Sequence, residues 1–163
     1  MKRVIYPGTF DPFTKGHLHI LEKARKLFDE VIVVIMDNPS KKTMFSLEER
    51  ISFIESNIIG ITNVRIVSAS GLTVQFAKDV QACAMIRGVR SLKDYEYEVE
   101  LANVNQLLSN EIETLLFISD ASYAHISSSN VKTIAQYHGD VSAFVNQTVA
   151  HALYAHFKKG VKK

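Results

Sequence analysis

A stretch near the N-terminus, residues 6–17, combines a constrained backbone with side chains that suit phosphate binding. It reads Tyr-Pro-Gly-Thr-Phe-Asp-Pro-Phe-Thr-Lys-Gly-His and lies between a short apolar run and a helical pattern. Its two prolines and two glycines fix or free the backbone, and Thr9, Lys15 and His17 offer contacts to an anion. Since a helix is expected to begin here, backbone N–H groups and the positive end of its dipole would face the same anion. The stretch predicts half of a phosphate-handling site.

The elements that must position this stretch follow an alternating pattern. Apolar runs of four to six residues alternate with helical patterns, which is typical of an α/β fold with a five-stranded parallel sheet covered by helices on both faces. The apolar run at 31–36 is continuous, so we expect a central strand. A capping box, Ser46 to Glu49, predicts a helix start. The expected strands are 3–6, 31–36, 64–67, 84–86 and 114–118; the expected helices are about 15–28, 47–58, 72–79 and 92–108, one opening at 126–131, and 146–157.

Length and composition narrow the class of protein. A chain of 163 residues with 47% hydrophobic and 22% charged residues predicts one soluble domain, residues 1–163. The formal net charge of +2 predicts no nucleic-acid partner, and the lysines near the C-terminus look like a solvated tail. Cys83 lies in an apolar run, which favours a structural thiol in a reducing compartment. We find no signal peptide and no apolar run of membrane-spanning length, so we expect a cytoplasmic location without membrane contact.

Polar clusters follow four of the expected strands. In an open parallel sheet, ligands bind outside the carboxyl ends of the strands, near the point where the strand order reverses. Residues 7–17 follow the first strand, Lys41 and Lys42 the second, Arg87 to Arg90 the fourth, and the serines at 127–129 the fifth. We therefore expect all four clusters to meet at one edge of the sheet.

Each cluster also has a plain structural interpretation. Lys41 and Lys42, taken alone, fit a solvated loop, and the residues around Thr9 fit a turn. Two arginines directly after a buried strand favour an anion site, because a charge there needs a partner. A helix cap requires only one of the three serines at 127–129, so the others suit a polyphosphate. The other histidines form no ligand spacing and are interpreted as structural or surface residues; only His125 lies near the predicted site.

With these residues assembled, the sequence resembles the nucleotidyltransferase superfamily of Rossmann-like folds. The shared features are Gly8-Thr9-Phe10-Asp11-Pro12 and the tetrad Thr14-Lys15-Gly16-His17. Within the superfamily it is similar to the bacterial phosphopantetheine adenylyltransferase family. The motifs that narrow the resemblance occur in the family's order, at 39–42, 45–50, 86–90, 94–98 and 126–129.

The resemblance implies transfer of AMP from ATP to 4′-phosphopantetheine, giving dephospho-coenzyme A and pyrophosphate in coenzyme A biosynthesis. The nucleophile is then a substrate phosphate, so positioning and charge neutralisation carry the chemistry without a covalent intermediate. The implied catalytic residues are His17, Lys41, Thr9 and Arg90. Those implied to bind the acceptor are Thr9, Lys41, Thr73, Arg87 and Asn105. Those implied to bind ATP are Thr9, Phe10, His17, Gly88, Val89, Arg90, Glu98, Tyr123, Ala124, His125, Ile126, Ser127, Ser128 and Ser129.

The same resemblance implies Mg²⁺ bound with ATP, a homohexamer, and coenzyme A as a candidate feedback ligand. No carboxylate cluster looks like a dedicated metal site, so phosphates and water would hold the ion. The apolar residues of the expected helix at 92–108 are compatible with a subunit interface. In the tetrad, Lys15 occupies the variable position and is interpreted as a solvated residue.

Two alternatives stay open from the residues. The tetrad also fits another small transferase of the superfamily, such as a nicotinamide mononucleotide adenylyltransferase or a cytidylyltransferase. A non-catalytic protein that binds a nucleotide or coenzyme A is the second alternative, although His17 and Lys41 are both present.

Overall fold

The structure is a computed structural model that describes residues 1–37 and 42–158, and at its centre lies a parallel β-sheet. Its strands are β1 (Arg3–Gly8), β2 (Glu30–Asp37), β3 (Val64–Ser70), β4 (Ala84–Val89) and β5 (Glu113–Ile118), in the order β3-β2-β1-β4-β5. All four pairings of neighbouring strands are parallel. The predicted α/β fold with five parallel strands is confirmed.

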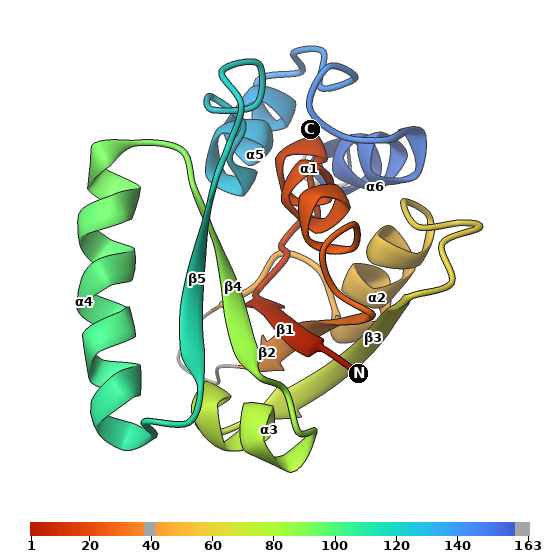
Figure 1. The fold of residues 1–163 in the computed structure, drawn as a ribbon. Coiled ribbons are helices and arrows are strands. Elements are labelled where there is room, and N and C mark those ends of the chain that lie inside the picture. The colour runs from red at the N-terminus through yellow and green to blue at the C-terminus, as the bar shows by residue number, and fades with distance from the viewer. Residues whose placement is uncertain (38–41, 159–163) are drawn as a thin grey trace.

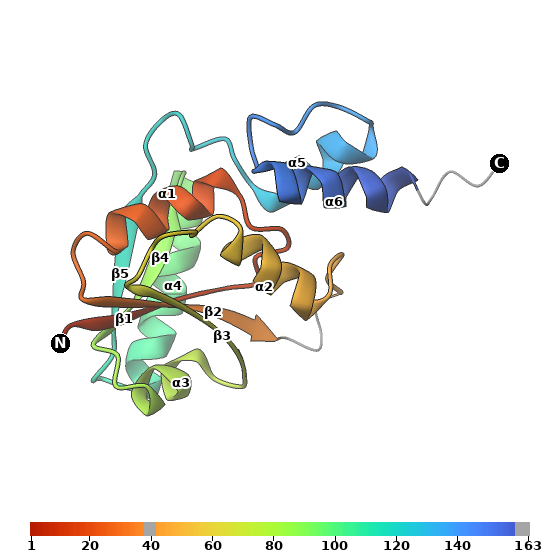
Figure 2. The ribbon, with the colours of Figure 1, turned by 90° about the vertical axis from the view of Figure 1, so that its right-hand side faces the viewer.

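The helices cover both faces of the sheet (Figures 1 and 2). The described helices are α1 (Lys15–Ala24), α2 (Leu47–Glu55), α3 (Thr73–Asp79), α4 (Leu92–Leu108), α5 (Ser128–Gln136) and α6 (Gln147–Lys158). The larger core packs one face of the sheet against α1, α2, α5 and α6, while a smaller core lies between the other face and α3. None of the helices within 1–37 and 42–158 is long and apolar enough to cross a membrane.

The continuous apolar run of β2 is explained by burial on both faces. Val31, Val33 and Ile35 belong to the larger core, and Ile32 and Val34 to the smaller one. Side chains alternate between the two faces of a strand, so positions 31–35 of this run are all buried. The prediction that this run forms a central strand is confirmed, because β2 pairs with β1 on one side and β3 on the other. Its neighbour β1 occupies the middle of the sheet.

The strand order reverses between β1 and β4. From β1 the chain adds β2 and then β3 on one side, and it returns to add β4 and β5 on the other. The carboxyl ends of β1 and β4 therefore flank the point at which a parallel sheet binds its ligands. Four polar clusters were predicted to meet at this edge of the sheet.

Some predicted boundaries were wrong. β4 continues through residues 87–89, which pair with β5, so Arg87 lies within the strand and not after it. α2 ends at Glu55, where the side chains of Ser56 and Asn57 donate to the carbonyl of Phe53. α1 ends at Ala24 instead of residue 28. Cys83 is exposed, and its Sγ donates to the carbonyl of Arg3.

Candidate active site

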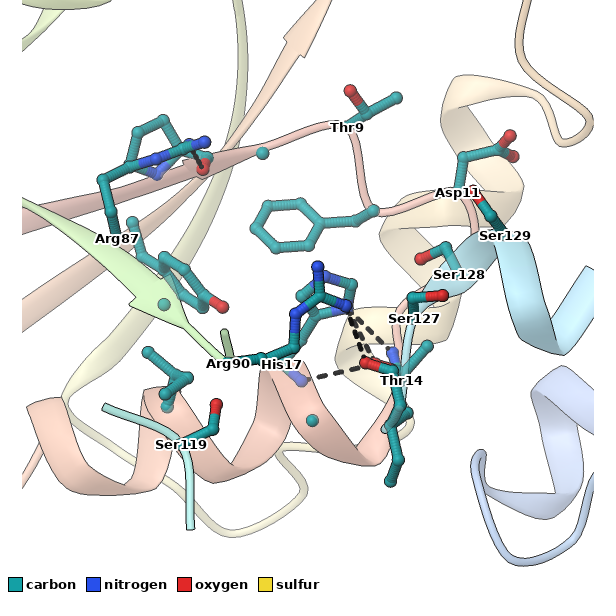
Figure 3. A pocket seen from close by; sticks show the side chains of 18 of the residues that line it. Thr9, Asp11, Thr14, His17, Arg87, Arg90, Ser119, Ser127, Ser128 and Ser129 are labelled. Carbon is teal, nitrogen blue, oxygen red and sulfur yellow. Dashed lines mark hydrogen bonds between the residues drawn. The ribbon is translucent and has the colours of Figure 1, made fainter. Parts of the chain in front are cut away.

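A cleft of about 530 Å³ opens at the carboxyl ends of β1 and β4. Its walls come from the turn after β1, the start of α1, the end of β4, α4 and the start of α5 (Figure 3). The predicted residues that line it are Thr9, Phe10, His17, Arg87, Gly88, Arg90, Glu98, Ile126, Ser127, Ser128 and Ser129. The predicted clusters after β1, β4 and β5 therefore meet in one cleft, which Lys42 of the cluster after β2 also lines.

The turn after β1 is held in an unusual backbone conformation by a packed aromatic ring. Phe10 has a φ of 51°, in the left-handed region that residues other than glycine seldom adopt, and its side chain is buried. The ring lies where a side chain on Gly8 would be, because a Cβ built there would come within 2.8 Å of it. Phe10 also packs edge-to-face on His17, with ring centroids 5.2 Å apart. The turn thus fixes the position of the His17 imidazole.

His17 takes part in the cap of α1, which determines its tautomer. The Thr14 backbone N–H donates to His17 Nδ1 at 3.1 Å, and the His17 backbone N–H donates to Thr14 Oγ1 at 3.3 Å. The pair forms a capping box in which an imidazole replaces the usual Glu or Gln. Because Nδ1 accepts a hydrogen bond, a neutral imidazole must carry its proton on Nε2. The Nε2–H is then available as a donor in the cleft.

The charge state of His17 follows from its surroundings. Burial, reinforced by the positive charges of Arg90 and Arg87, lowers the pKa of His17 to about 3. The imidazole is therefore neutral at physiological pH. In that state it can donate a hydrogen bond from Nε2 but carries no positive charge.

Arg87 is held between the sheet and α4. Its guanidinium donates to both carboxylate oxygens of Glu98, at 2.6 and 2.7 Å, and its Nη1 donates to the carbonyl of Pro7 at 2.9 Å. Burial opposes the charge of Arg87, but the hydrogen bonds to Glu98 and the negative charge of that carboxylate together outweigh it and raise the pKa of the guanidinium. The forked contact fixes the direction of Arg87 at the edge of the cleft.

Arg90 connects the end of β4 to the loop before α5. Its guanidinium donates to Asp94 on the first turn of α4, at 2.8 Å, and to the carbonyl of Ile126, at 2.9 Å. These contacts hold a positive charge beside the serines that begin α5.

The three serines at the start of α5 divide their roles. Ser127 is the N-cap, accepting a hydrogen bond from Asn130, and Ser128 donates its hydroxyl proton to the carbonyl of Pro12 at 2.8 Å. Ser129 also lines the cleft. One serine therefore caps the helix, as expected, while a second ties α5 to the turn after β1. The N-terminus of α5 faces the cleft, where its dipole favours an anion.

Sequence reasoning missed a buried cluster of contacts centred on Asp11. The carboxylate of Asp11 accepts backbone N–H groups of Met44 and Phe45, at 2.9 and 3.0 Å, and forms an ion pair with Lys132 at 3.0 Å. Arg50 donates to the carbonyl of Thr9 nearby. Lys132 lines the cleft. The only sign of this in the sequence was that Lys132 lies on the same face of its helix as Ser128 and Ser129.

The remaining predicted residues lie at different distances from the cleft. Thr73 and Asn105 line a smaller cavity on the other side of Arg87. Val89, Tyr123, Ala124 and His125 do not line the cleft, although Val89 and His125 are next in sequence to residues that do. Lys41 lies outside the described residues, although Lys42 lines the cleft.

Two interpretations of side chains outside the predicted site can be compared with the structure. His19 was interpreted as a structural or surface residue, and its ring stacks on Tyr123, with centroids 4.2 Å apart. That stacking joins α1 to the segment before α5. Lys15 donates its Nζ proton to the carbonyl of Ser142, which agrees with its exclusion from the site.

The arrangement suits chemistry on phosphate groups. Two arginines, a neutral imidazole donor, serine hydroxyls and a helix N-terminus face one cleft, and such groups can stabilise negative charge that develops during a displacement at phosphorus. Among the described residues, no group of three or more His, Cys, Asp or Glu side chains could hold a metal ion. The fold and the cleft are those of a nucleotidyltransferase.

Comparison with known proteins narrows this class. The family model described as cytidylyltransferase-like matches residues 5–134. The chain is 47% identical over 153 residues to a phosphopantetheine adenylyltransferase of Syntrophomonas wolfei, covering 94% of this chain and 95% of the relative. It is 48% identical over 151 residues to one of Hamiltonella defensa, covering 93% and 97%. The chain belongs to the phosphopantetheine adenylyltransferase family.

A solved structure shares the fold at low sequence identity. A crystal structure from Vibrio parahaemolyticus, proposed to be a nicotinate-nucleotide adenylyltransferase, matches with a TM-score of 0.69 at 18% identity. The match covers 94% of this chain and 99% of that one. It supports the assignment of the fold alone.

Proposed function

We propose that the cleft transfers the AMP moiety of ATP to the phosphate of 4′-phosphopantetheine, giving dephospho-coenzyme A and pyrophosphate. The observation that carries this proposal is the neutral His17, held by the cap of α1 with its Nε2–H available in a cleft that also contains Arg87 and Arg90. A donor that is fixed before the reaction needs no reorganisation when charge develops on the α-phosphate.

The reaction balances without a protein nucleophile. An oxygen of the acceptor phosphate forms a bond to the α-phosphorus of ATP, and the bond from that phosphorus to the bridging oxygen of the β-phosphate breaks. The electron pair of the broken bond leaves with pyrophosphate. Since the attacking oxygen is already anionic, no general base is required, and the site contributes positioning and charge neutralisation.

We assign the residues to the two substrates as follows. His17 donates to the α-phosphate, while Arg90 and the start of α5 bind the β- and γ-phosphates, where the helix dipole and the guanidinium act together. Thr9 and Arg87 hold the acceptor phosphate on the opposite side. Lys41 joins them in this proposal, on the strength of the family resemblance.

Mg²⁺ enters this proposal with ATP. The buried carboxylate of Asp11 is already engaged by two backbone N–H groups and Lys132, and that of Glu98 by Arg87. Neither fits a metal cage, so the phosphate oxygens and water hold the ion and offset phosphate charge. No step is assigned to a protein ligand of the metal.

Assembly, feedback and location are further parts of the proposal. Leu92, Val104, Leu107 and Leu108 of α4 are exposed apolar side chains, and they support burial of this helix between subunits of a homohexamer. Coenzyme A contains the phosphopantetheine group, so it is proposed to compete for the cleft as a feedback ligand. A cytoplasmic location stays a prediction.

The experiment that tests the function is release of pyrophosphate from ATP in the presence of different acceptors. We expect turnover with ATP and 4′-phosphopantetheine. We expect none with nicotinamide mononucleotide as the acceptor, and none when CTP is the donor and the acceptor is a phosphorylated alcohol that lacks the amide arm. Lys41→Met should impair use of the acceptor far more than ATP binding. Turnover of another acceptor but not of phosphopantetheine would reject the proposal, and tight ATP binding without any pyrophosphate release would indicate a sensor.

A further inference from the structure

A second, smaller cavity lies next to the cleft, on the other side of Arg87. Its volume is about 120 Å³, and it is lined by Thr73, Met85, Leu101, Ala102, Asn105 and Thr114. Pro7, Arg87 and Glu98 line both spaces, so the cavity begins where the cleft ends. A ligand whose phosphate lies beside Arg87 can extend a narrow chain into it.

The cavity contains a buried hydroxyl group that satisfies no hydrogen bond. Within residues 1–37 and 42–158, Thr114 Oγ1 is the buried side-chain polar atom without a hydrogen-bond partner. Leu115 and Phe117, its neighbours on β5, pack against the larger core, so Thr114 faces the opposite side of the sheet, toward α4. A buried hydroxyl without a partner destabilises a fold, whereas valine would fill the same space without that cost.

A second polar side chain in the cavity has only a weak partner. Asn105 on α4 directs its Nδ2 at the sulfur of Met85, at 3.4 Å, and thioether sulfur is a poor acceptor. Around these two polar groups the lining is apolar, from Met85, Leu101 and Ala102. A narrow apolar channel with a hydroxyl and a carboxamide suits an aliphatic chain interrupted by amide groups.

We propose that Thr114 is a substrate-binding residue whose hydroxyl forms a hydrogen bond with an amide group in the arm of the acceptor. The inference rests on the proposed function, because phosphopantetheine is a phosphate joined to such an amide-bearing chain. A hydroxyl both donates and accepts, so it pairs with either the carbonyl or the N–H of the amide. Thr114 thereby distinguishes the full acceptor from phosphorylated alcohols that lack the arm.

The test compares Thr114→Val, which removes only the hydroxyl, with Thr114→Ser, which keeps it. The KM for phosphopantetheine and its dissociation constant from calorimetry are measured for both variants. The dissociation constant of a truncated acceptor that has the phosphate but no amide is measured beside them. We expect Thr114→Val to weaken binding of the full acceptor about 3- to 10-fold, the effect of one lost hydrogen bond, and to leave the truncated acceptor unchanged. Thr114→Ser should bind the full acceptor nearly as the unaltered protein does.

A purely structural role predicts a different outcome. Thr114→Val should then raise the melting temperature without changing the dissociation constant of either acceptor, and that result would overturn the inference while leaving the proposed function intact. An equal loss with both acceptors would overturn it too, since the arm would not be involved. If the unaltered protein neither binds nor converts phosphopantetheine, the proposed function fails first, and the inference fails with it.

Discussion

Replacing His17 by asparagine separates its two roles, the cap of α1 and the contact to the α-phosphate. The Oδ1 of asparagine is as many bonds from Cα as Nδ1 of histidine, so it can still accept the Thr14 backbone N–H, a hydrogen bond of 3.1 Å in the structure. The Nε2–H has no counterpart in asparagine. His17→Asn should therefore keep the cap and lose only the donor to the developing charge, whereas His17→Ala loses both.

The expected sizes of the two losses differ. Loss of one preorganised donor to a developing oxyanion lowers kcat by about 100- to 1,000-fold, or roughly 3 to 4 kcal/mol of transition-state stabilisation. Loss of a helix cap costs about 1 kcal/mol of folding free energy. We thus expect both variants to lose kcat alike, while only His17→Ala loses about 1 kcal/mol of stability.

The assay is pyrophosphate release at saturating ATP and acceptor, with ATP affinity from calorimetry and stability from urea unfolding. The ATP dissociation constant should change less than about threefold, because the contact is proposed to strengthen mainly in the transition state. A kcat for His17→Asn close to that of the unaltered protein would refute the assignment of Nε2–H as the donor. A loss of ATP affinity as large as the loss of kcat would refute the claim that the His17 contact strengthens mainly in the transition state.

Three further predictions concern charge in and around the cleft. Because the pKa of His17 is lowered to about 3, while an unfolded histidine titrates near 6.5, the unfolded chain binds the extra proton below pH 6.5. Stability should fall by about 1.6 kcal/mol between pH 6.5 and 5, a loss that His17→Asn removes in unfolding titrations, and kcat should show no limb near pH 6.5. Glu98→Gln breaks the forked pair with Arg87, so the free energy of unfolding should fall by about 1 to 3 kcal/mol and the acceptor KM should rise. An unchanged KM would argue against Arg87 as an acceptor contact. Asp11→Asn weakens the hydrogen bonds that hold residues 44–45, so it should lower the melting temperature and raise the acceptor KM. The dependence of activity on Mg²⁺ should stay the same. A changed Mg²⁺ dependence would mean that Asp11 binds the ion.

Local sequence patterns predicted the main elements and the start of α2. The apolar run of β2 predicted a strand buried on both faces, and Ser46 and Glu49 form the predicted capping box. The box at α1 went unrecognised, because His17 stands where the pattern expects Glu or Gln. Helix ends were less well predicted, since α1 and α2 both stop three residues or more before their apolar pattern does.

The sequence by itself determined which residues could bind phosphate and at which edge of the sheet they would meet. That much follows from short-range pattern and from the geometry of parallel sheets, in which the carboxyl ends of all strands lie on one side. The family could also be read from the order of the motifs.

Only the tertiary structure decided which charged groups pair with one another. Asp11 meets Lys132 across 121 positions of sequence, and Arg87 turns to Glu98 because β4 continues beyond its predicted end and lies beside α4. The orphan hydroxyl of Thr114 depends in the same way on the face of β5 that it occupies. Such contacts depend on strand register and helix placement, which the whole core sets, so no local pattern in the sequence specifies them.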